Sequence, residues 1–436
     1  MTQSKVKIGN YRWSICALVF FATTVNYLDR QVISLLKDDY LEKIFHWTES
    51  DYSYIVIAFQ IAYAVGMLGA GWIIDKVGTK IGYAISLAVW SLAAIGHSFA
   101  RSTIGFMIAR SVLGISEAGN FPAAIKTTAE WFPKKERALA TGLFNSGSNV
   151  GAIIAPLTVP LIAATMGWGW AFILTGAAGL IWLIFWFAFY EIPSKHKKLS
   201  KEEYEYIHSD SEENSSGPNN KEKIKWSTLL TYKQTWAFVI GKFLTDPIWW
   251  FYLFWLPSFL NKQYNMTKTD VALPVAVVYT MTTFGSIFGG WLSGHFIKRG
   301  WSEYKSRKTA MFLFALCILP VISAQALGKL DPWYAILIIG LAASCHQAWS
   351  ANIFTTASDM FPKKAVASIT GIGGMAGAVG GILIARLAGL LFDYYKSVNS
   401  LETGYYIMFI ICGLAYILAW FIFYVVLVPR MKKVEL

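Results

Sequence analysis

Residues 103–131 read TIGFMIARSVLGISEAGNFPAAIKTTAEW and form the fourth of a series of long apolar stretches. Arg110 and Glu117 are charged and lie well inside this stretch, away from its ends, although a helix surrounded by lipid seldom carries charges there. They are seven residues apart, which is two helical turns, so both side chains face the same side of a helix. The same spacing corresponds to about 10.5 Å of rise, which favours separate partners. A static Arg110–Glu117 bridge is the alternative.

The ending of this stretch belongs to an internal repeat. The matched segments are FPKK at 132–135 and 361–364, VG at 150–151 and 379–380, and GMLGAGW at 66–72 with GSIFGGW at 285–291. The copies lie six apolar stretches apart, so both halves cross the membrane in the same direction. Two similar halves of this kind are typical of secondary transporters.

The composition predicts a membrane protein. Of the 436 residues, 55% are hydrophobic and 15% are charged, whereas a soluble protein carries about 25% charge. The apolar residues form twelve runs of roughly 20 residues, each long enough to cross a ~30 Å hydrocarbon core. We predict an all-α membrane protein with twelve spans. They lie near 13–35, 54–74, 81–99, 103–131, 137–165, 168–190, 234–260, 271–297, 308–328, 332–360, 365–393 and 403–428.

A polar segment divides these spans six to six. We predict an N-terminal half over 1–190, a mobile linker over 191–233 and a C-terminal half over 234–436. The linker is expected to bury no core and has room for a short surface helix. Lys and Arg concentrate in alternate loops, in both termini and in the linker. The positive-inside rule therefore predicts that the termini and the linker are cytoplasmic.

Other classes of protein are disfavoured. The loop distribution of Lys and Arg accounts for the net charge of +12 without a nucleic-acid partner. No ATP-binding motif, Ser-His-Asp set or metal-ligand cluster is recognisable, so we expect no enzyme, no metal and no cofactor. The cysteines have no paired spacing and are expected to be buried thiols. They are Cys16, Cys317, Cys345 and Cys412.

Over its whole length, the chain resembles a known family of proteins. GWIIDKVGTK at 71–80 resembles the loop signature G-x-x-x-D-R/K-x-G-R/K-R/K of the major facilitator superfamily, and 110–114 resembles its R-x-x-x-G motif. The second copy of the loop, GWLSGH at 290–295, lacks the acid, so we expect only the first to act as a full latch. The resemblance implies a cytoplasmic gate made by Gly71, Asp75, Lys76, Gly78, Lys80 and Arg137.

A finer resemblance is to the anion:cation symporter family, and within it to hexuronate transporters. It is carried by NYLDR at 26–30, by the Arg110 and Glu117 pair, by KFLTDP at 242–247 and by HQAWSAN at 346–352. It implies a monomer in a bacterial inner membrane, with a hexuronate and protons as partners.

Each charge inside the membrane needs a reason, because it costs about 2.5–3.5 kcal/mol on insertion scales. Asp29 and Arg30 are adjacent, so their side chains diverge by about 100° on a helix and face different partners. Arg30 is suited to a bidentate grip on a carboxylate. By resemblance, Asp29 and Glu117 are the protonatable pair, modulated by Arg110. The alternative is a fixed ion network that only locks the N-terminal half.

The sugar itself needs neutral hydrogen-bonding groups and aromatic faces. Lys242 and Asp246 are four residues apart, which leaves both self-pairing and a substrate contact open. For His346, a structural hydrogen bond is the alternative. The predicted substrate-binding residues are Tyr27, Arg30, Ser148, Asn149, Lys242, His346, Gln347, Trp349 and Asn352. A structural i,i+4 pair is expected for Lys126 and Glu130.

These observations predict a proton-coupled symporter that imports a hexuronate, glucuronate or galacturonate, by alternating access. One alternative is transport of another organic anion, such as galactonate or another aldonate or aldarate. The alternative of another class is a nutrient sensor that keeps the fold without transport. The intact Asp29, Glu117 and 71–80 loop argue against the sensor.

Overall fold

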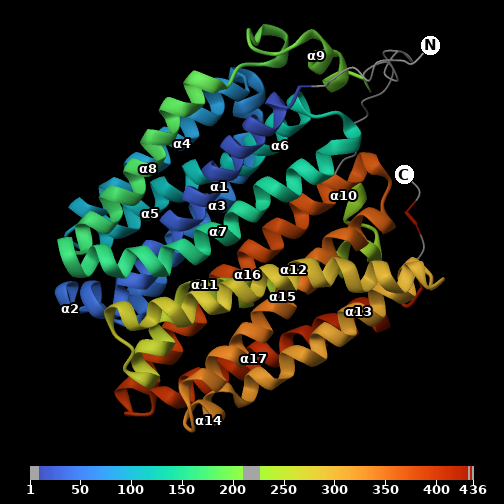
Figure 1. Cartoon of the computed structure of the whole chain (residues 1–436). Coiled ribbons are helices and arrows are strands. Elements are labelled where there is room, and N and C mark those ends of the chain that lie inside the picture. The colour runs from blue at the N-terminus through green and yellow to red at the C-terminus, as the bar shows by residue number, and fades with distance from the viewer. Residues whose placement is uncertain (1–8, 210–225, 431–432, 435–436) are drawn as a thin grey trace. The chain divides into compact units, whose positions relative to one another are not determined.

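The structure is a computed structural model that describes residues 9–209, 226–430 and 433–434. These residues are helical almost throughout and contain no strand, which confirms the predicted all-α class (Figure 1).

Six spans precede the linker, and their bounds lie close to the predicted ones. They are α1 (Tyr11–Leu36), α3 (Glu49–Val77), α4 (Thr79–Gly96) with a 3-10 turn His97–Phe99, α5 (Thr103–Glu117) with α6 (Asn120–Trp131), α7 (Lys134–Met166) and α8 (Trp168–Phe189). A π-helical turn Lys37–Leu41 and the short α2 (Glu42–Phe45) connect α1 to α3.

Six more spans follow the short helices α9 (Lys201–Ile207) and α10 (Trp226–Leu229). They are α11 (Lys233–Tyr264), α12 (Ala272–Lys298), α13 (Glu303–Ile318) continuing into α14 (Ala324–Gly328), α15 (Pro332–Met360), α16 (Lys363–Ser397) and α17 (Leu401–Phe421). Within the described residues, nine of the twelve spans qualify as membrane-crossing by length and composition alone. The other three are α1, the α5–α6 pair and α11, which carry most of the intramembrane charges singled out above.

The fourth span is broken where the sequence predicted one continuous helix. α5 ends at Glu117 and α6 begins at Asn120. Pro122 explains the break, because its ring clashes with the carbonyl four residues earlier, at Ala118, in a regular helix. Gly119 lies at the break, where an added Cβ would overlap Ser86 of α4. The break leaves Glu117 at the last position of α5.

The described chain forms two compact units by its contacts. Unit 1 comprises Met1–Val32, Ile61–Ala155 and Thr165–Lys221, and unit 2 comprises Ile33–Gln60, Pro156–Ala164 and Glu222–Leu436. Three helices, α1, α3 and α7, therefore contribute residues to both units. The predicted division into halves at 190 and 234 rests on the repeat rather than on contacts, and it stays a prediction.

The repeat returns in the helix packing inside each unit. Gly66 of α3 abuts Ile115 of α5, and its counterpart Gly285 of α12 abuts Ser344 of α15. Counted from the two FPKK endings, Ile115 and Ser344 are equivalent positions. A Cβ at either glycine would overlap the facing backbone, so these crossings need glycine. The pair Gly151 and Gly380 behaves in the same way against α1 and α11.

The first part of the linker is ordered, and the expectation that it buries no core is wrong for residues 191–209. Glu203 of α9 is 2% exposed and accepts hydrogen bonds from the backbone N–H groups of Tyr11 and Arg12, at the first turn of α1. A carboxylate there satisfies amide groups that a helix start leaves unpaired. Arg12 also pairs with Glu136 at the start of α7, at 2.8 Å. Residues 210–225 lie outside the described part.

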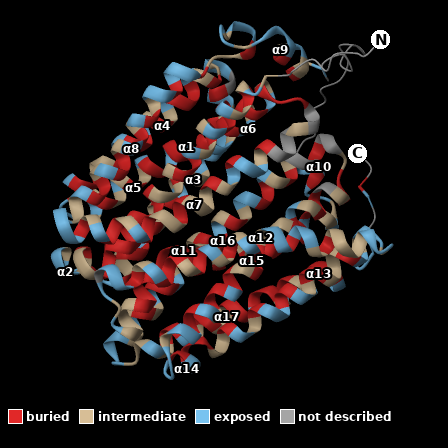
Figure 2. Cartoon of the chain, viewed as in Figure 1, coloured by how far each residue is buried: buried red, intermediate tan, exposed pale blue. Residues whose placement is uncertain are grey.

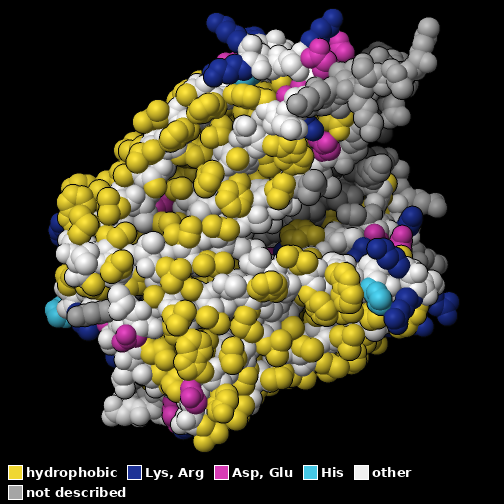
Figure 3. Space-filling view, in the orientation of Figure 1, with side chains coloured by type: hydrophobic (Ala, Val, Ile, Leu, Met, Phe, Trp, Pro, Cys, Tyr) yellow, Lys and Arg dark blue, Asp and Glu magenta, His cyan; other side chains and the backbone are white. Residues whose placement is uncertain are grey.

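Burial and side-chain type fit a bilayer. In Figure 2 the buried residues form stripes along helices such as α15 and α17, with exposed residues between them. Over α4 and α8 the visible surface is largely hydrophobic, whereas Lys and Arg gather around α9 and near the start of α13 (Figure 3). The outward residues of α8 include Ile181, Ile184, Phe185 and Phe187. Apolar surface of this extent is stable only in lipid, so the chain is an integral membrane protein.

Candidate functional site

A buried ion pair connects the first and fourth spans. Arg30 Nε of α1 lies 2.5 Å from Glu117 Oε2 of α5, and the two side chains are 4% and 0% exposed. The partner of Glu117 is therefore on another helix, and the structure contains no direct Arg110–Glu117 bridge. A charge-assisted hydrogen bond in so dry a place is strong, because little water competes for either group.

Two tyrosine rings hold the Arg30 guanidinium from the sides. Its Cζ lies 4.8 Å from the ring centre of Tyr27 and 4.7 Å from that of Tyr63, both within cation–π range. Sequence reasoning named Tyr27 but missed Tyr63. The available signal was its place on α3 one turn before Gly66, where the repeat brings α3 against α5. This cage orients a planar cation towards a planar anion.

Arg110 and Asp29 lie beside this pair. Arg110 Nη2 donates to the backbone oxygen of Arg30 at 2.9 Å, so it braces the helix that carries Arg30. Asp29 is 2% exposed, and both of its carboxylate oxygens are enclosed away from water. Its polar neighbours are Glu117, Thr175 and Arg110. An enclosed carboxyl with so few donors is suited to carrying a proton.

The two predicted polar residues of α7 are less engaged. Ser148 Oγ donates to the carbonyl of Asn145 in its own helix at 2.7 Å. Asn149 is half-buried. Their predicted substrate contacts stay predictions.

Lys242 and Asp246 of α11 pair with each other, as one of the two possibilities left open by the sequence requires, and the predicted substrate contact of Lys242 stays a prediction. Lys242 Nζ lies 2.7 Å from Asp246 Oδ2 and 4.1 Å from the ring centre of Phe354 on α15. Lys242 is 4% exposed. A substrate contact of Lys242 requires this pair to open.

His346 lies in an aromatic cluster formed by α11, α12, α15 and α17. Its Nδ1 is 2.6 Å from the hydroxyl of Tyr416, and its ring is stacked on Trp249 at 5.4 Å with an 8° angle between the planes. Trp249 in turn meets Tyr279 edge to face. Tyr279 and Tyr416 were not identified from the sequence, because α12 and α17 carry no charged or motif residue at those places.

The other predicted residues of α15 differ in their surroundings. Trp349 is fully buried against Tyr416, and Gln347 is half-buried. Asn352 donates to the carbonyls of Gly289 and Ala348 and accepts from Arg307. These bonds use both amide hydrogens and the oxygen, which fits a role in packing α15 against α12. A contact of Asn352 with a substrate stays a prediction.

The signature loop joins α3 to α4. Gly78 has a φ of +86°, a conformation that strongly favours glycine, and it precedes the first residue of α4. Lys80 pairs with Glu191 at 2.8 Å and lowers the pKa of that carboxyl, and Lys76 lies over the ring of Trp72. Gly71 has open space beside it. The side chains of Asp75 and Arg137 lie outside the described part.

The expected Lys126–Glu130 pair is wrong. Lys126 donates to the carbonyl of Ile74, and Glu130 accepts from the hydroxyls of Thr79 and Tyr190, each at 2.6 Å.

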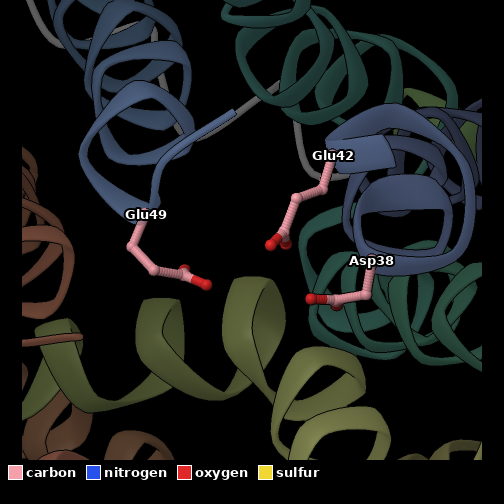
Figure 4. A group of neighbouring side chains, drawn as sticks. All are labelled: Asp38, Glu42 and Glu49. Carbon is pink, nitrogen blue, oxygen red and sulfur yellow. The ribbon is translucent and has the colours of Figure 1, made fainter. Parts of the chain in front are cut away.

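A second charge cluster lies in unit 2, and sequence reasoning missed it. Carboxylates of Asp38, Glu42 and Glu49 turn towards one space (Figure 4), within 4.8 Å of one another. Lys37 Nζ lies 2.9 Å from Glu49 and 3.1 Å from Asp38, and Lys262 Nζ of α11 lies 2.7 Å from Glu42. These ammonium groups already stand where a metal ion would bind, so the cluster is an ion network rather than a metal centre.

This ion cluster explains why the C-terminal end of α1 and the N-terminal end of α3 belong to unit 2. Lys37 also contacts Ser258 of α11 at 3.1 Å, and the carboxylate of Asp393 on α16 accepts from the first N–H groups of α3. The signal in the sequence was the spacing of the acids at 38, 42 and 49. Lys262, which completes the cluster, is 220 residues from Glu42 in the sequence.

Comparisons with known proteins agree with this architecture. The sequence profile of the Major Facilitator Superfamily matches residues 19–385. A hexuronate transporter of Escherichia coli (strain K12) is 33% identical over 389 residues, covering 89% of each chain. A galacturonate transporter of Dickeya chrysanthemi is 36% identical over 286 residues, covering 66% of this chain and 82% of the relative. The crystal structure of a bacterial homologue of the human lysosomal transporter Spinster superposes with a TM-score of 0.79 over 99% of this chain and 100% of that one, at 14% identity.

A twelve-span helical fold with an internal parallel repeat and charges buried inside it defines a membrane transporter rather than an enzyme. The chain belongs to the Major Facilitator Superfamily.

Proposed function

We propose that this protein is a proton-coupled symporter that imports an anionic sugar acid, with a hexuronate such as glucuronate or galacturonate as the substrate. The names of its relatives in E. coli and D. chrysanthemi support the substrate class. The observation that carries the proposal is the Arg30–Glu117 pair inside its tyrosine cage.

The coupling follows from competition for one cation. A substrate carboxylate and the Glu117 carboxylate both require the Arg30 guanidinium, and this guanidinium is already engaged when Glu117 is ionised. Protonation of Glu117 removes its charge and releases Arg30 for the substrate. Binding of the anion and binding of a proton are therefore mutually favourable, which is the thermodynamic requirement for symport.

Asp29 takes the role of a second proton carrier. One proton neutralises a monoanionic substrate, whereas two protons make import electrogenic. We assign recognition of the sugar hydroxyls to the neutral and aromatic groups of unit 2 around His346. We further propose an inner-membrane location, alternating access and a monomer. The distribution of Lys and Arg supports cytoplasmic termini.

Uptake into proteoliposomes tests the proposal. Labelled glucuronate and galacturonate are expected to accumulate when the pH is lower outside, and a protonophore is expected to abolish accumulation. Uptake that is unchanged by the pH gradient and by the protonophore contradicts proton coupling.

A competition panel decides the substrate. Galactonate, another aldonate and an aldarate are added in excess to the labelled hexuronate. Stronger competition by galactonate than by either hexuronate replaces the hexuronate assignment with the aldonate alternative. Binding of a sugar acid without any uptake favours the sensor, and the absence of both contradicts the sugar-acid proposal.

A further inference from the structure

The hydrogen bond between Tyr416 and His346 bears on the tautomer of the His346 ring as well as on its position. The Tyr416 hydroxyl lies 2.6 Å from His346 Nδ1 and 3.4 Å from the carbonyl of Thr245. A hydroxyl has one proton to donate, and 3.4 Å is beyond the usual range for an O–H···O bond. The shorter contact favours donation to Nδ1 of a neutral imidazole, an arrangement in which the ring's own hydrogen is on Nε2.

The ring cannot rotate away from this arrangement. Trp249 of α11 covers one face of His346 in a nearly parallel stack, and the Tyr416 ring meets it edge to face at 80°. Tyr416 is itself held by Trp349, at 5.5 Å and 85°. Helices α11, α15 and α17 thus set the direction in which the Nε2–H bond points.

His346 Nε2 has no hydrogen-bond partner among the described residues, although the residue is only 4% exposed. The Nε2 atom itself is not completely enclosed, so water or a small ligand can reach it. Tyr416 is 0% exposed and reaches no ligand directly.

We propose that Tyr416 is a positioning residue, which holds the His346 tautomer whose Nε2–H donates a hydrogen bond to one ring hydroxyl of the sugar acid. The proposal rests on the proposed function and adds to it the group that reads that hydroxyl. It assigns α17 a part in substrate selection although its tyrosine never touches the substrate.

Amide variants of His346 test the donor. The side-chain amide nitrogen of glutamine overlays Nε2, and that of asparagine overlays Nδ1. We expect His346→Gln to keep the KM for hexuronate within about threefold of wild type and His346→Asn to raise it about tenfold, since one hydrogen bond is lost. A lower KM for the asparagine variant than for the glutamine variant overturns the proposal, whether or not Tyr416 variants fold.

A double-mutant cycle tests the positioning role. Tyr416→Phe is expected to raise the KM about 3- to 10-fold in wild type, with an unchanged maximal counterflow rate, and to have no effect in the His346→Gln background. An equal effect in both backgrounds makes Tyr416 a packing residue only and overturns the proposal.

Monodeoxy hexuronates separate the two roles of Tyr416, because a loss of packing alone should not change the discrimination between a hexuronate and its monodeoxy analogues. Wild type is expected to discriminate against one monodeoxy analogue, and Tyr416→Phe is expected to reduce that discrimination. Failure of the proposed function is distinct, because then wild type itself takes up no hexuronate. A wild type that transports hexuronate but shows an additive cycle refutes only the role of Tyr416.

Discussion

Replacement of Glu117 by glutamine tests the competition for Arg30 most directly. The variant keeps the shape of the side chain but removes the charge that faces Arg30 Nε at 2.5 Å, between groups that are 4% and 0% exposed. A hydrogen bond to a charged group contributes about 1.5–3 kcal/mol net. A substrate that must displace ionised Glu117 binds more weakly by that amount, which is about 10- to 150-fold in affinity. We therefore expect Glu117→Gln to bind hexuronate 10- to 150-fold more tightly than wild type at alkaline pH.

Titration calorimetry in detergent from acidic to alkaline pH measures this difference. The two proteins are expected to converge at acidic pH, where wild-type Glu117 is protonated. In proteoliposomes the variant should keep counterflow exchange and lose accumulation against a gradient. Glu130→Gln is the matched control, because Glu130 on the same span accepts only from hydroxyls among its described bonds. An unchanged pH dependence of binding in Glu117→Gln, or full uphill accumulation, refutes the reasoning.

Three further outcomes follow from the charge arrangement. Arg30→Lys loses the planar fork and should weaken hexuronate binding about 30-fold, or roughly 2 kcal/mol, whereas unchanged affinity makes Arg30 structural. Lys37→Met removes a 1%-exposed cation and should cost about 3 kcal/mol of stability, seen as a lower Tm, while the 68%-exposed Lys43→Met should change little; equal shifts contradict this. Although burial alone raises the pKa of Glu42, its lysine partners Lys37 and Lys262 lower it from 4.5 to about 2. Its contribution to stability is therefore complete above pH 4.5 and lost as the pH falls towards 2, so the Tm difference from Glu42→Gln should shrink over that interval rather than stay constant.

The fold was predictable because its signals are repeated along the chain. Several features of the sequence independently indicate membrane helices in two repeated halves. They are the twelve apolar runs, the two FPKK endings and the matched glycines at 66 and 285. Backbone groups must be satisfied internally in lipid, which leaves the helix as the only structure for such runs. The break after Glu117 was also readable, from Pro122, but the length of the apolar run concealed it. The burial of Glu203 was not readable, because it depends on α1 supplying the partners of α9.

The partners of the buried charges were less predictable, because spacing along one helix says nothing about neighbouring helices. The 10.5 Å between Arg110 and Glu117 predicted separate partners, and nothing in the sequence pointed to Arg30, 87 residues away from Glu117. The same holds for Lys37, whose cluster draws on Lys262 in the seventh span. A pattern of buried charges in a sequence thus predicts that an ion network exists, but it does not predict which residues pair with each other.

Two Lys–acid combinations with identical spacing show what decides whether an i,i+4 ion pair forms. Lys242 and Asp246 are four residues apart and pair at 2.7 Å, while Lys126 and Glu130 are also four apart and do not pair. The hydroxyls of Thr79 and Tyr190 satisfy the Glu130 carboxylate, and a carbonyl accepts from Lys126. Because hydroxyls from neighbouring helices satisfy the Glu130 carboxylate, an i,i+4 pair with Lys126 loses its advantage of a few tenths of a kcal/mol. The Phe354 ring lies over Lys242 instead, and the Asp246 carboxylate on the same helix is the ionic partner of Lys242.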